Sequence, residues 1–585
     1  MFEKVLIANR GEIAIRVMRT LEELGVASVA VYSEPDRDAP HVRRAGEAYL
    51  LGAGPASQSY LNAQRIIEAA HRADAEAIHP GYGFLAENAA FARACEEAGL
   101  VFIGPPAEAI EAMGSKTRAR ELMRAAGVPI VPGTTEPVAS VEDARELIDG
   151  SIGYPVAIKA AGGGGGKGFR VAESEEELAK AFEGAASEGE RFFSDATVYV
   201  ERYLPDPRHV EVQLLADGEG NVIHLFERDC SVQRRHQKLI EESPAPAVDP
   251  ELRERIGAIG TAAARAVGYR SAGTVEGLLA GGEYFFLEMN TRVQVEHCVT
   301  EMVTGIDIVR EQVRIAAGEP LAYRQEDVVL RGHAIECRIN AEDAAKRFAP
   351  APGTIGSYRE PAGPFVRVDS GAEAGYAVLP LYDPMIAKLV VWDVDREAAT
   401  RRMLRALSEF EIGGLKTLIP FHRALLATDQ WRNGETCRDL VEDGDWLKAL
   451  AFPPPPAAAS EGEDGEERVE RDYAVEVSGK RFEVKVIGSG VGPNGAAPRK
   501  APRRERRVAG GSGGAPGALI SPLQGTVLSV AVEEGAEVEQ GALICVVEAM
   551  KMENEITAPS AGTVEQLGVA QGGTVATGDT IAVIR

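Results

Sequence analysis

Short apolar runs alternate with longer amphipathic stretches along the first part of the chain. Runs of this kind are typical of buried strands, whereas apolar residues that recur every three or four positions indicate helices. The expected strands are 4–8, 28–32, 77–78 and 101–103, and the expected helices are 12–24 and 89–98. This alternation predicts an open α/β sheet with helices on both faces and a ligand crevice at the C-terminal ends of its strands.

Two further blocks of regular pattern follow. The block 116–323 begins with a helical stretch and continues into glycine-interrupted, strand-like sequence. The block 330–450 combines strand patterns at 334–339 and 387–392 with a helical pattern at 396–408. Both blocks therefore predict mixed α and β structure.

Composition changes abruptly after these blocks. A proline run and an acidic run between 453 and 470 lack the residues needed for a core and indicate a linker. A hairpin is expected where the alternating segments 473–477 and 481–487 flank a Ser-Gly-Lys turn. Gly, Pro, Ala and Arg dominate again from 488 to 514, which indicates a second tether and a mobile end domain.

The C-terminal part contains an internal repeat. A shift of about 37 residues aligns Gly525-Thr526-Val527 with Gly562-Thr563-Val564, and it also aligns Val538 with Val575 and Ile544 with Ile581. Each half predicts short strands joined by turns, and two such halves can pair into a small β sandwich. Lys551 falls between the halves, at or near a hairpin tip that a modifying enzyme can reach. The alternative is an ordinary solvated surface lysine.

Charge and cysteine usage exclude several classes of function. The chain has 585 residues, too many for one core, and a formal net charge of −26. This acidity argues against nucleic acid or an anionic membrane as the main partner. No targeting pattern and no long apolar run is visible, so a cytoplasmic protein is expected. Six cysteines without a CxxC pair indicate reduced thiols rather than disulfides or a zinc site.

A glycine run interrupted by Lys167 spans residues 162–168 and follows the strand-like segment 156–159. Glycine lets backbone N–H groups approach phosphate oxygens closely, so this segment is a candidate phosphate-binding loop. It is not a Walker P-loop, because glycine rather than Ser or Thr follows Lys167. A mobile surface loop is the alternative.

Two carboxylates and an amide are candidate metal ligands. Glu276 and Glu288 lie in adjacent strand-like runs around the turn Gly281-Gly282, and Asn290 follows closely. Antiparallel neighbours can bring these side chains to one point, and hard oxygen ligands suit Mg²⁺ that bridges nucleotide phosphates. The alternative is that both glutamates are solvated residues on a strand face.

The polar segment 290–297 comes directly after these candidate ligands. Arg292 suits planar, bidentate binding of an oxyanion such as bicarbonate. Glu296 can act as a general base beside it. A second polar cluster, 227–238, is too charged for a core, and an exposed, salt-linked loop is its alternative interpretation.

Together these segments resemble the biotin carboxylase module of the ATP-grasp superfamily. The resemblance rests on LIANRGEIA (6–14), HPGYGFLAEN (79–88), the glycine run, the segment 228–246, EMNTRVQVEH (288–297) and GHAIECRINAE (332–342), and it covers nearly all of 1–450. Met550 and Met552 around Lys551 resemble a biotinyl domain, although lipoyl domains share the repeat and the tip lysine. With this end domain, the chain resembles the α subunit of a bacterial acyl-CoA carboxylase.

The resemblance implies a multidomain α/β protein with an all-β end domain. Its expected parts are an open α/β N-terminal domain (1–115), an ATP-grasp domain (116–330), an α+β C-terminal carboxylase domain (331–450), a linker with the hairpin (451–515) and a biotinyl/lipoyl-like barrel sandwich (516–585).

The resemblance also implies a role for each candidate residue. Those expected to hold ATP are Lys116, Lys159, Gly164, Gly165, Gly166, Glu201, His209, Gln233 and His236. Those expected to hold one or two Mg²⁺ (or Mn²⁺) ions are Glu276, Glu288 and Asn290. Lys238 is expected at the γ-phosphate and the carboxyphosphate made from it, and bicarbonate is expected on Arg292, Gln294 and Val295. Glu296 is the expected base. Tyr82 and Arg338 are expected at the biotin ring, where Arg338 would stabilise the ureido anion. Lys551 is expected to carry the biotin.

The implied reaction activates bicarbonate with ATP and transfers CO₂ to a biotin nitrogen. Cations must then outnumber anions around the transferred phosphoryl group. A separate carboxyltransferase β subunit would pass the carboxyl group to an acyl-CoA of the acetyl or propionyl type. A biotin protein ligase and a second copy of the carboxylase module are the other implied partners. Another acceptor, such as pyruvate or urea, and a non-catalytic biotin carrier are the alternatives.

Two features depart from the family pattern. Cys298 stands where many relatives have proline or threonine, a change expected to affect packing more than catalysis; Cys230 and Cys337, inside motif segments, are also expected to be packing residues. The region between the two modules is short, whereas longer α subunits have a full domain there that binds the carboxyltransferase. The 473–487 hairpin is the candidate docking element.

Overall fold

The computed structural model divides the chain into two compact units, 1–453 and 454–585, which are described separately. The described residues are 1–134, 136–160, 169–193, 197–235, 237–450, 468–477, 480–489, 518–521, 525–549, 552–570, 573–575 and 579–585.

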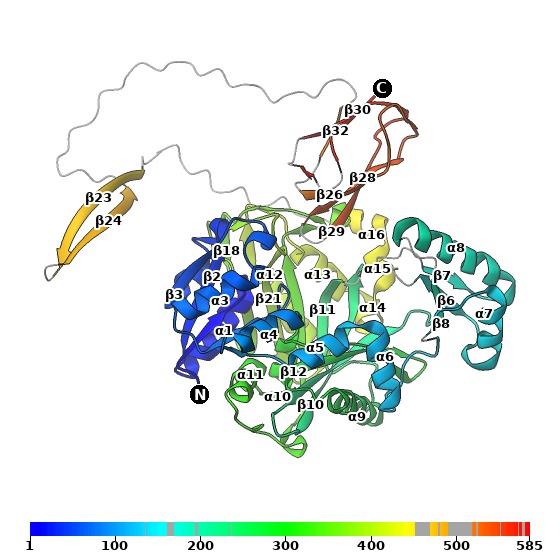
Figure 1. Ribbon diagram of the computed structural model, residues 1–585, viewed down its shortest axis with the longest axis horizontal. Helices are drawn as coiled ribbons and strands as arrows, with labels where there is room; N and C mark the ends of the chain where they lie inside the picture. The colour runs from blue at the N-terminus through cyan, green and yellow to red at the C-terminus, as the bar shows by residue number, and fades with distance from the viewer. Residues whose placement is uncertain are drawn as a thin grey trace. The chain divides into compact units, whose positions relative to one another are not determined.

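The first unit begins with a parallel sheet of five strands in the order β3-β2-β1-β4-β5 (Figure 1, blue). Its elements are β1 (Lys4–Ile7), α1 (Gly11–Glu23), β2 (Ala27–Ser33), α2 (Pro40–Arg44), β3 (Glu47–Gly52), α3 (Ala63–Arg72), β4 (Ala77–His79), α4 (Ala89–Glu97), β5 (Val101–Phe102) and α5 (Ala107–Gly114). The expected α/β alternation is confirmed. No strand is expected from the sequence between 32 and 77, so β3 is an additional edge strand, and its residues are mostly half-exposed.

A small sheet of three strands, in the order β7-β6-β8, follows with its own helices. It consists of α7 (Val141–Leu147), β6 (Val156–Ala160), β7 (Phe169–Ala172), α8 (Glu175–Phe193) and β8 (Val198–Arg202). The preceding helix, α6 (Lys116–Ala125), packs instead on α9 and β13. Ile158 and Val200 from the sheet and Leu178 and Phe182 from α8 pack in a core cluster of their own. The expected glycine loop, 162–168, lies outside the described residues. The flanking strands, β6 before it and β7 after it, are described.

The largest element is an antiparallel sheet of eight strands in the order β13-β12-β9-β10-β11-β14-β21-β19. Its strands are β9 (Arg208–Ala216), β10 (Val222–Arg234), β11 (Gln237–Ser243), β12 (Ser271–Ala280), β13 (Glu283–Asn290), β14 (His333–Asn340), β19 (Val366–Ser370) and β21 (Met385–Asp393). The sheet runs across the boundary expected at residue 330, because β14 pairs with β11. The second and third expected domains therefore share one sheet.

Helices cover this sheet and join it to the N-terminal part. α9 (Pro250–Ala266) packs on β9 and β10, α10 (His297–Thr304) on β14 and β21, α11 (Ile308–Ala316) on β12, and α12 (Arg396–Glu409) on β21. Val5 and Ile7 of β1, Leu225 of β10, and Val309 and Val313 of α11 belong to one buried cluster. This shared core fixes the N-terminal sheet against the large sheet.

Short elements complete the first unit. They are β15 (Glu342–Asp343), β16 (Ala349–Pro350), β17 (Gly353–Thr354), β18 (Ser357–Arg359), β20 (Ala377–Val378), β22 (Glu411–Gly413), α13 (Ile419–Leu426), α14 (Asp429–Arg432), α15 (Arg438–Glu442) and α16 (Gly444–Ala449). Of the described helices in either unit, none has the length and apolarity that a membrane-spanning helix needs.

The second unit contains a hairpin and a small β domain. β23 (Arg468–Val477) pairs antiparallel with β24 (Lys480–Ser489), so the expected hairpin is present with longer strands than its pattern indicated. The β domain has two sheets of four strands, β25-β32-β30-β27 and β29-β28-β26-β31. Its strands are β25 (Ala518–Ile520), β26 (Gly525–Val530), β27 (Glu537–Val538), β28 (Leu543–Ala549), β29 (Met552–Thr557), β30 (Gly562–Leu567), β31 (Thr574–Val575) and β32 (Thr580–Ile584).

The internal repeat determines this β domain. β26, β27 and β28 correspond to β30, β31 and β32 at the shift of about 37 residues found in the sequence. The apolar residues that the shift aligns are buried in one core: Val527 and Val564, Val538 and Val575, Ile544 and Ile581. β28 and β29 pair up to Ala549 and Met552, and Lys551 between them lies outside the described residues.

Candidate active site

The eight-stranded sheet places charged side chains in a row across its strands. Glu276 on β12 lies directly opposite Glu211 on β9 and opposite Glu288 on β13. Glu211 in turn lies opposite Arg228 on β10. Residues opposite one another in antiparallel strands project from the same face, so the pairing register itself brings these groups together. Glu276 is buried and Glu288 is exposed, so the alternative that both are solvated residues on a strand face is wrong for Glu276.

Lys238 on β11 bridges three carboxylates. Its Nζ donates to Glu211 Oε2 at 2.6 Å, to Glu276 Oε1 at 2.9 Å and to Glu296 Oε1 at 2.6 Å. Burial acts to lower the pKa of Lys238, but Glu211 and Glu296 outweigh it and raise this pKa well above its ordinary value. Likewise burial acts to raise the pKa of Glu296, yet Lys238 and then Arg338 hold it well below the usual range. The site therefore contains an ammonium group and ionised carboxylates.

Arg228 binds Glu211, one of the three carboxylates that contact Lys238. It is fully buried, and its Nε donates to Glu211 Oε1 at 2.6 Å. Three further N–H groups of Arg228 donate to the side chains of Gln213 (2.8 Å), Thr300 (2.9 Å) and Thr274 (3.2 Å). With these donors engaged, Arg228 holds the Glu211 carboxylate in place for Lys238.

Arg292 orients two amide side chains toward Glu276. Its Nη2 donates to Asn290 Oδ1 at 2.8 Å and its Nη1 to Gln294 Oε1 at 2.9 Å. Because the amide oxygens accept from Arg292, the amide NH₂ groups point the other way, and both donate to Glu276 Oε1, at 2.7 Å from Asn290 and 2.6 Å from Gln294. Arg292 also donates to Glu87 Oε2 at 2.9 Å. Hydrogen bonds to Asn290, Gln294 and Glu87 therefore fix the Arg292 side chain, the candidate for oxyanion binding.

Glu296 lies between two cations. It is fully buried, immediately before α10, and its Oε2 accepts from Arg338 Nη2 at 3.0 Å, while Oε1 accepts from Lys238. Arg338 on β14 donates from Nε to Glu241 Oε1 at 2.5 Å. Burial acts to lower the pKa of Arg338, but Glu241 and Glu296 raise it above its ordinary value.

Tyr82 and Val295 are linked through buried charges. Asn9 donates to the Tyr82 carbonyl at 2.8 Å, and the Tyr82 hydroxyl donates to Glu12. Lys388, which is fully buried, forms an ion pair with Glu12 at 3.3 Å and donates to the Val295 carbonyl at 2.9 Å. The backbone of the candidate bicarbonate segment is therefore held by a lysine on β21.

Two of the residues expected to bind the nucleotide, His209 and Gln233, lie next to each other and close to Glu276. His209 Nε2 and Glu276 Oε2 are 2.5 Å apart, and Gln233 Nε2 lies 3.1 Å from His209 Nδ1. Burial acts to lower the pKa of His209, but the Glu276 carboxylate outweighs it and raises this pKa. On the small sheet, Lys159 forms an ion pair with Glu201. Lys116 begins α6, and Gly164, Gly165, Gly166, His236 and Lys551 lie outside the described residues.

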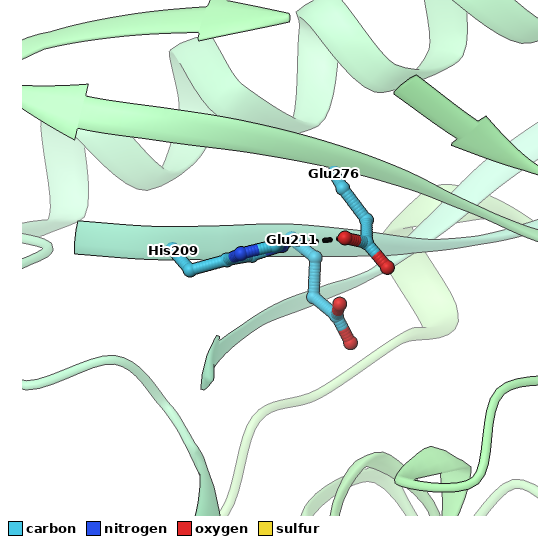
Figure 2. A group of neighbouring side chains, drawn as sticks. All are labelled: His209, Glu211 and Glu276. Carbon is cyan, nitrogen blue, oxygen red and sulfur yellow. Dashed lines mark hydrogen bonds and ion pairs between the residues drawn. The ribbon is translucent and has the colours of Figure 1, made fainter. Parts of the chain in front are cut away.

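The site fits a divalent cation. His209, Glu211 and Glu276 offer ligand atoms that all lie within 4.8 Å of one another (Figure 2). Three carboxylates, those of Glu211, Glu276 and Glu296, meet at the Lys238 ammonium group, so oxygen ligands are concentrated there. Carboxylate and amide oxygens are the ligands that Mg²⁺ prefers. The register places the Glu288 carboxylate opposite Glu276 as a further oxygen ligand, whereas Asn290 presents its NH₂ group to Glu276.

Comparisons with known proteins agree with this arrangement. Family models match at 1–110 (biotin carboxylase, N-terminal domain), 115–324 (carbamoyl-phosphate synthase L chain, ATP binding domain), 336–443 (biotin carboxylase C-terminal domain) and 517–584 (biotin-requiring enzyme). The biotin carboxylase 1 of Bacillus subtilis is 54% identical over 447 residues, which is 76% of this chain and 99% of that protein. The chain belongs to the biotin carboxylase family.

Other relatives of this biotin carboxylase carry the names of different carboxylases. A pyruvate carboxylase subunit from Methanothermobacter thermautotrophicus is 55% identical over 443 residues, 76% of this chain and 90% of that protein. The biotin carboxylase domain dimer of the Hydrogenobacter thermophilus 2-oxoglutarate carboxylase, solved with MgADP, ADP and bicarbonate, superposes with a TM-score of 0.71 at 50% identity, covering 77% of this chain and all of that one. Biotin carboxylase from Campylobacter jejuni gives 0.69 at 48% identity, covering 75% and 98%.

Sequence reasoning missed several buried charges of this biotin carboxylase. Glu211, Glu241 and Lys388 contact expected site residues, yet no pattern around them indicates that they are buried. The interpretation of 227–238 as an exposed loop is wrong, because these residues form β10 and the start of β11, with only Arg235 and His236 between them. The register of β10 between its neighbours is what buries the charges, and it is not visible locally.

The cysteines behave as packing residues. All six are free and buried. Burial raises the pKa of the Cys230, Cys298 and Cys337 thiols well above the ordinary value. Cys298 Sγ lies 3.3 Å from Asp369 Oδ2 and packs with Val299 and Val390, so the departure at this position lies on the buried face of α10.

Proposed function

We propose that the chain catalyses ATP- and bicarbonate-dependent carboxylation of biotin attached to its own Lys551. The observation that carries the proposal is the position of the Glu296 carboxylate between Lys238 and Arg338. In the proposed reaction Glu296 removes the bicarbonate proton, Lys238 holds the transferred phosphoryl group and Arg338 stabilises the anion of the biotin ring.

The hydrogen bonds of Lys238 give Glu296 a way to become a stronger base. An ammonium group has three N–H donors, and three carboxylates engage them. Lys238 cannot hold a phosphoryl group without giving up at least one carboxylate. When it turns to phosphate, Glu296 loses a cation, its pKa rises, and it can accept a proton. ATP binding would therefore prepare the base.

The other site residues take the roles that the family resemblance implies. Nucleotide is assigned to Lys116, Lys159, the loop with Gly164, Gly165 and Gly166, Glu201, His209, Gln233 and His236; Mg²⁺ (or Mn²⁺) to Glu276, Glu288 and Asn290; bicarbonate to Arg292, Gln294 and Val295; and the biotin ring to Tyr82 with Arg338. Biotin, when attached by a biotin protein ligase, supplies the nitrogen that receives the carboxyl group. The solved relative with MgADP and bicarbonate supports this set of ligands.

We further propose that a separate carboxyltransferase β subunit passes the carboxyl group to an acyl-CoA of the acetyl or propionyl type. The biotin-requiring domain at 517–584, in one chain with the carboxylase, supports an acyl-CoA carboxylase α subunit. Pyruvate is the second candidate, because the pyruvate carboxylase relative is 55% identical over 443 residues. The carboxylase module is proposed to form a dimer, as in the 2-oxoglutarate carboxylase relative.

Two experiments separate these claims. The first measures ATP hydrolysis by the full chain with bicarbonate, Mg²⁺ and added free biotin, beside Glu296→Gln. Hydrolysis that needs bicarbonate and rises with biotin is expected from the native chain only, and its absence in folded protein would overturn the enzyme assignment. The second reconstitutes the biotinylated chain with its co-purifying carboxyltransferase and offers acetyl-CoA, propionyl-CoA, pyruvate, 2-oxoglutarate or urea. Labelled product from an acyl-CoA is expected, and label only on pyruvate would select the second candidate.

A further inference from the structure

Two glutamates without a role in the proposed reaction lie next to Arg338. Glu241 on β11 and Glu336 on β14 are directly opposite one another in the antiparallel pair, and both are fully buried. Glu241 Oε1 accepts from Arg338 Nε at 2.5 Å. Neither oxygen of Glu336 has a hydrogen-bond partner among the residues that the structure describes. The two carboxyl groups are therefore neighbours in different electrostatic situations.

The contacts favour the anion at Glu241, which accepts from Arg338, and the neutral form at Glu336, which has no donor among the described residues. A buried carboxylate without a donor is strongly disfavoured, so Glu336 keeps its proton. Burial, and then the neighbouring Glu241, raises the pKa of Glu336 well above its ordinary value. Burial also raises the pKa of Glu241 to about 7, while Arg338 opposes this rise. The charged groups that face the pair are Arg338, Lys388, Lys238 and Glu296.

The Arg338 guanidinium is held at two points. Nε donates to Glu241 and Nη2 donates to Glu296 at 3.0 Å. A guanidinium group is planar and its N–H groups form a rigid fork, so two fixed contacts determine the plane of the whole group. A neutral Glu336 does not compete with Glu241 for this fork.

We propose that Glu241 is a positioning residue for biotin carboxylation: its carboxylate fixes the plane of the Arg338 guanidinium and keeps Nη2 directed at Glu296. This inference deepens the proposed function and rests on it, since Arg338 is the group assigned to the biotin ring. Without Glu241, Arg338 keeps its charge and loses its orientation. The step that needs biotin should suffer, whereas binding of ATP should not.

The test compares two substitutions of equal size at adjacent, equally buried positions. Glu241→Gln removes the charge that holds Arg338, and Glu336→Gln is the matched control because that carboxyl group is already neutral. Both are made in the full chain with Lys551→Ala, so that added free biotin is the only acceptor. Glu241→Asp, which keeps the charge on a shorter side chain, is the conservative variant.

Misplacement of a reacting group by a small distance costs on the order of 10²-fold in rate, so Glu241→Gln should lower kcat for biotin-dependent ATP hydrolysis roughly 10- to 100-fold. The KM for ATP should stay close to its native value, Glu241→Asp should recover part of the rate, and Glu336→Gln should behave like the parent chain. Equal losses in Glu241→Gln and Glu336→Gln, or a native rate in Glu241→Gln, would overturn the proposal.

A crystal structure of Glu241→Gln supplies a readout that does not depend on activity. The proposal expects the Arg338 guanidinium to rotate away from Glu296 in this variant and to stay in place in Glu336→Gln. An unmoved Arg338 would refute the positioning role. Absence of biotin-dependent hydrolysis in the parent chain would instead refute the proposed function, so the two failures are distinguishable.

Discussion

Replacement of Lys238 by methionine removes the ammonium group that three buried carboxylates share. Methionine has a similar unbranched length but no charge. The change deletes hydrogen bonds of 2.6 Å to Glu211, 2.9 Å to Glu276 and 2.6 Å to Glu296. Mutual repulsion of the carboxylates then acts against the fold of the eight-stranded sheet.

The magnitude depends on the cations that remain. Removal of one partner from a buried ion pair costs about 3–5 kcal/mol. Each carboxylate keeps a second cationic partner: Arg228 for Glu211, His209 for Glu276 and Arg338 for Glu296. We therefore expect a loss near the lower end, about 3 kcal/mol in the free energy of unfolding. Loss of a cation at the phosphoryl group should also lower kcat by about 10²- to 10³-fold.

Urea unfolding followed by tryptophan fluorescence measures this loss, because all three tryptophans, Trp392, Trp431 and Trp446, belong to the first unit. The control is Lys448→Met, which breaks an exposed ion pair with Asp445 at 3.4 Å and should cost at most about 1 kcal/mol. Added Mg²⁺ should restore more stability to Lys238→Met than to the native chain, since the variant cluster is more negative. Equal stability of Lys238→Met and Lys448→Met would refute the reasoning.

Three further outcomes are expected. Gly277→Ala should destabilise the sheet by about 1–3 kcal/mol relative to Gly444→Ala, because a Cβ at 277 would lie 2.2 Å from the Tyr284 ring whereas position 444 is open; equal urea midpoints would contradict this. Burial lowers the pKa of His79 to about 4, so the stability it contributes is present above about pH 6.5 and is lost as pH falls toward 4. His79→Gln should lose less stability than the native chain between pH 7 and 5, and parallel losses would argue against it. Arg292→Lys cannot orient both neighbouring amides, so kcat/KM for bicarbonate should fall at least about 10²-fold, and a native value would contradict the assignment.

The sequence predicts which segments form helices and strands better than it predicts which strands pair within a sheet. The α/β alternation of the N-terminal part and the repeat of the β domain are local or self-similar patterns, and both are confirmed. The pairing of β14 with β11 joins segments that are separated by several helices and strands, and periodicity carries no information about it. Edge strand β3 was not predicted, although its residues 48–51 are apolar.

The difference between local patterns and long-range pairing also explains which residues of the candidate site could be predicted from the sequence. Glu276 and Glu288 could be placed opposite one another because a tight turn joins their strands. Glu211 and Glu241 could not be found, since a glutamate in a strand is ordinarily solvated, and only the assembled sheet shows that these two are buried against Arg228 and Arg338. Motif resemblance identifies groups that contact substrate, whereas the groups that orient them become visible only in three dimensions.

Transfer of label from bicarbonate to the chain itself tests the central claim most directly. The full chain, co-expressed with a biotin protein ligase, is incubated with ATP, Mg²⁺ and ¹⁴C-bicarbonate and separated from free label under alkaline denaturing conditions. We expect acid-labile label in proportion to bound biotin, and none in Lys551→Ala or Glu296→Gln. Folded, biotinylated protein that takes up no label, or label that persists in Lys551→Ala, would contradict the account.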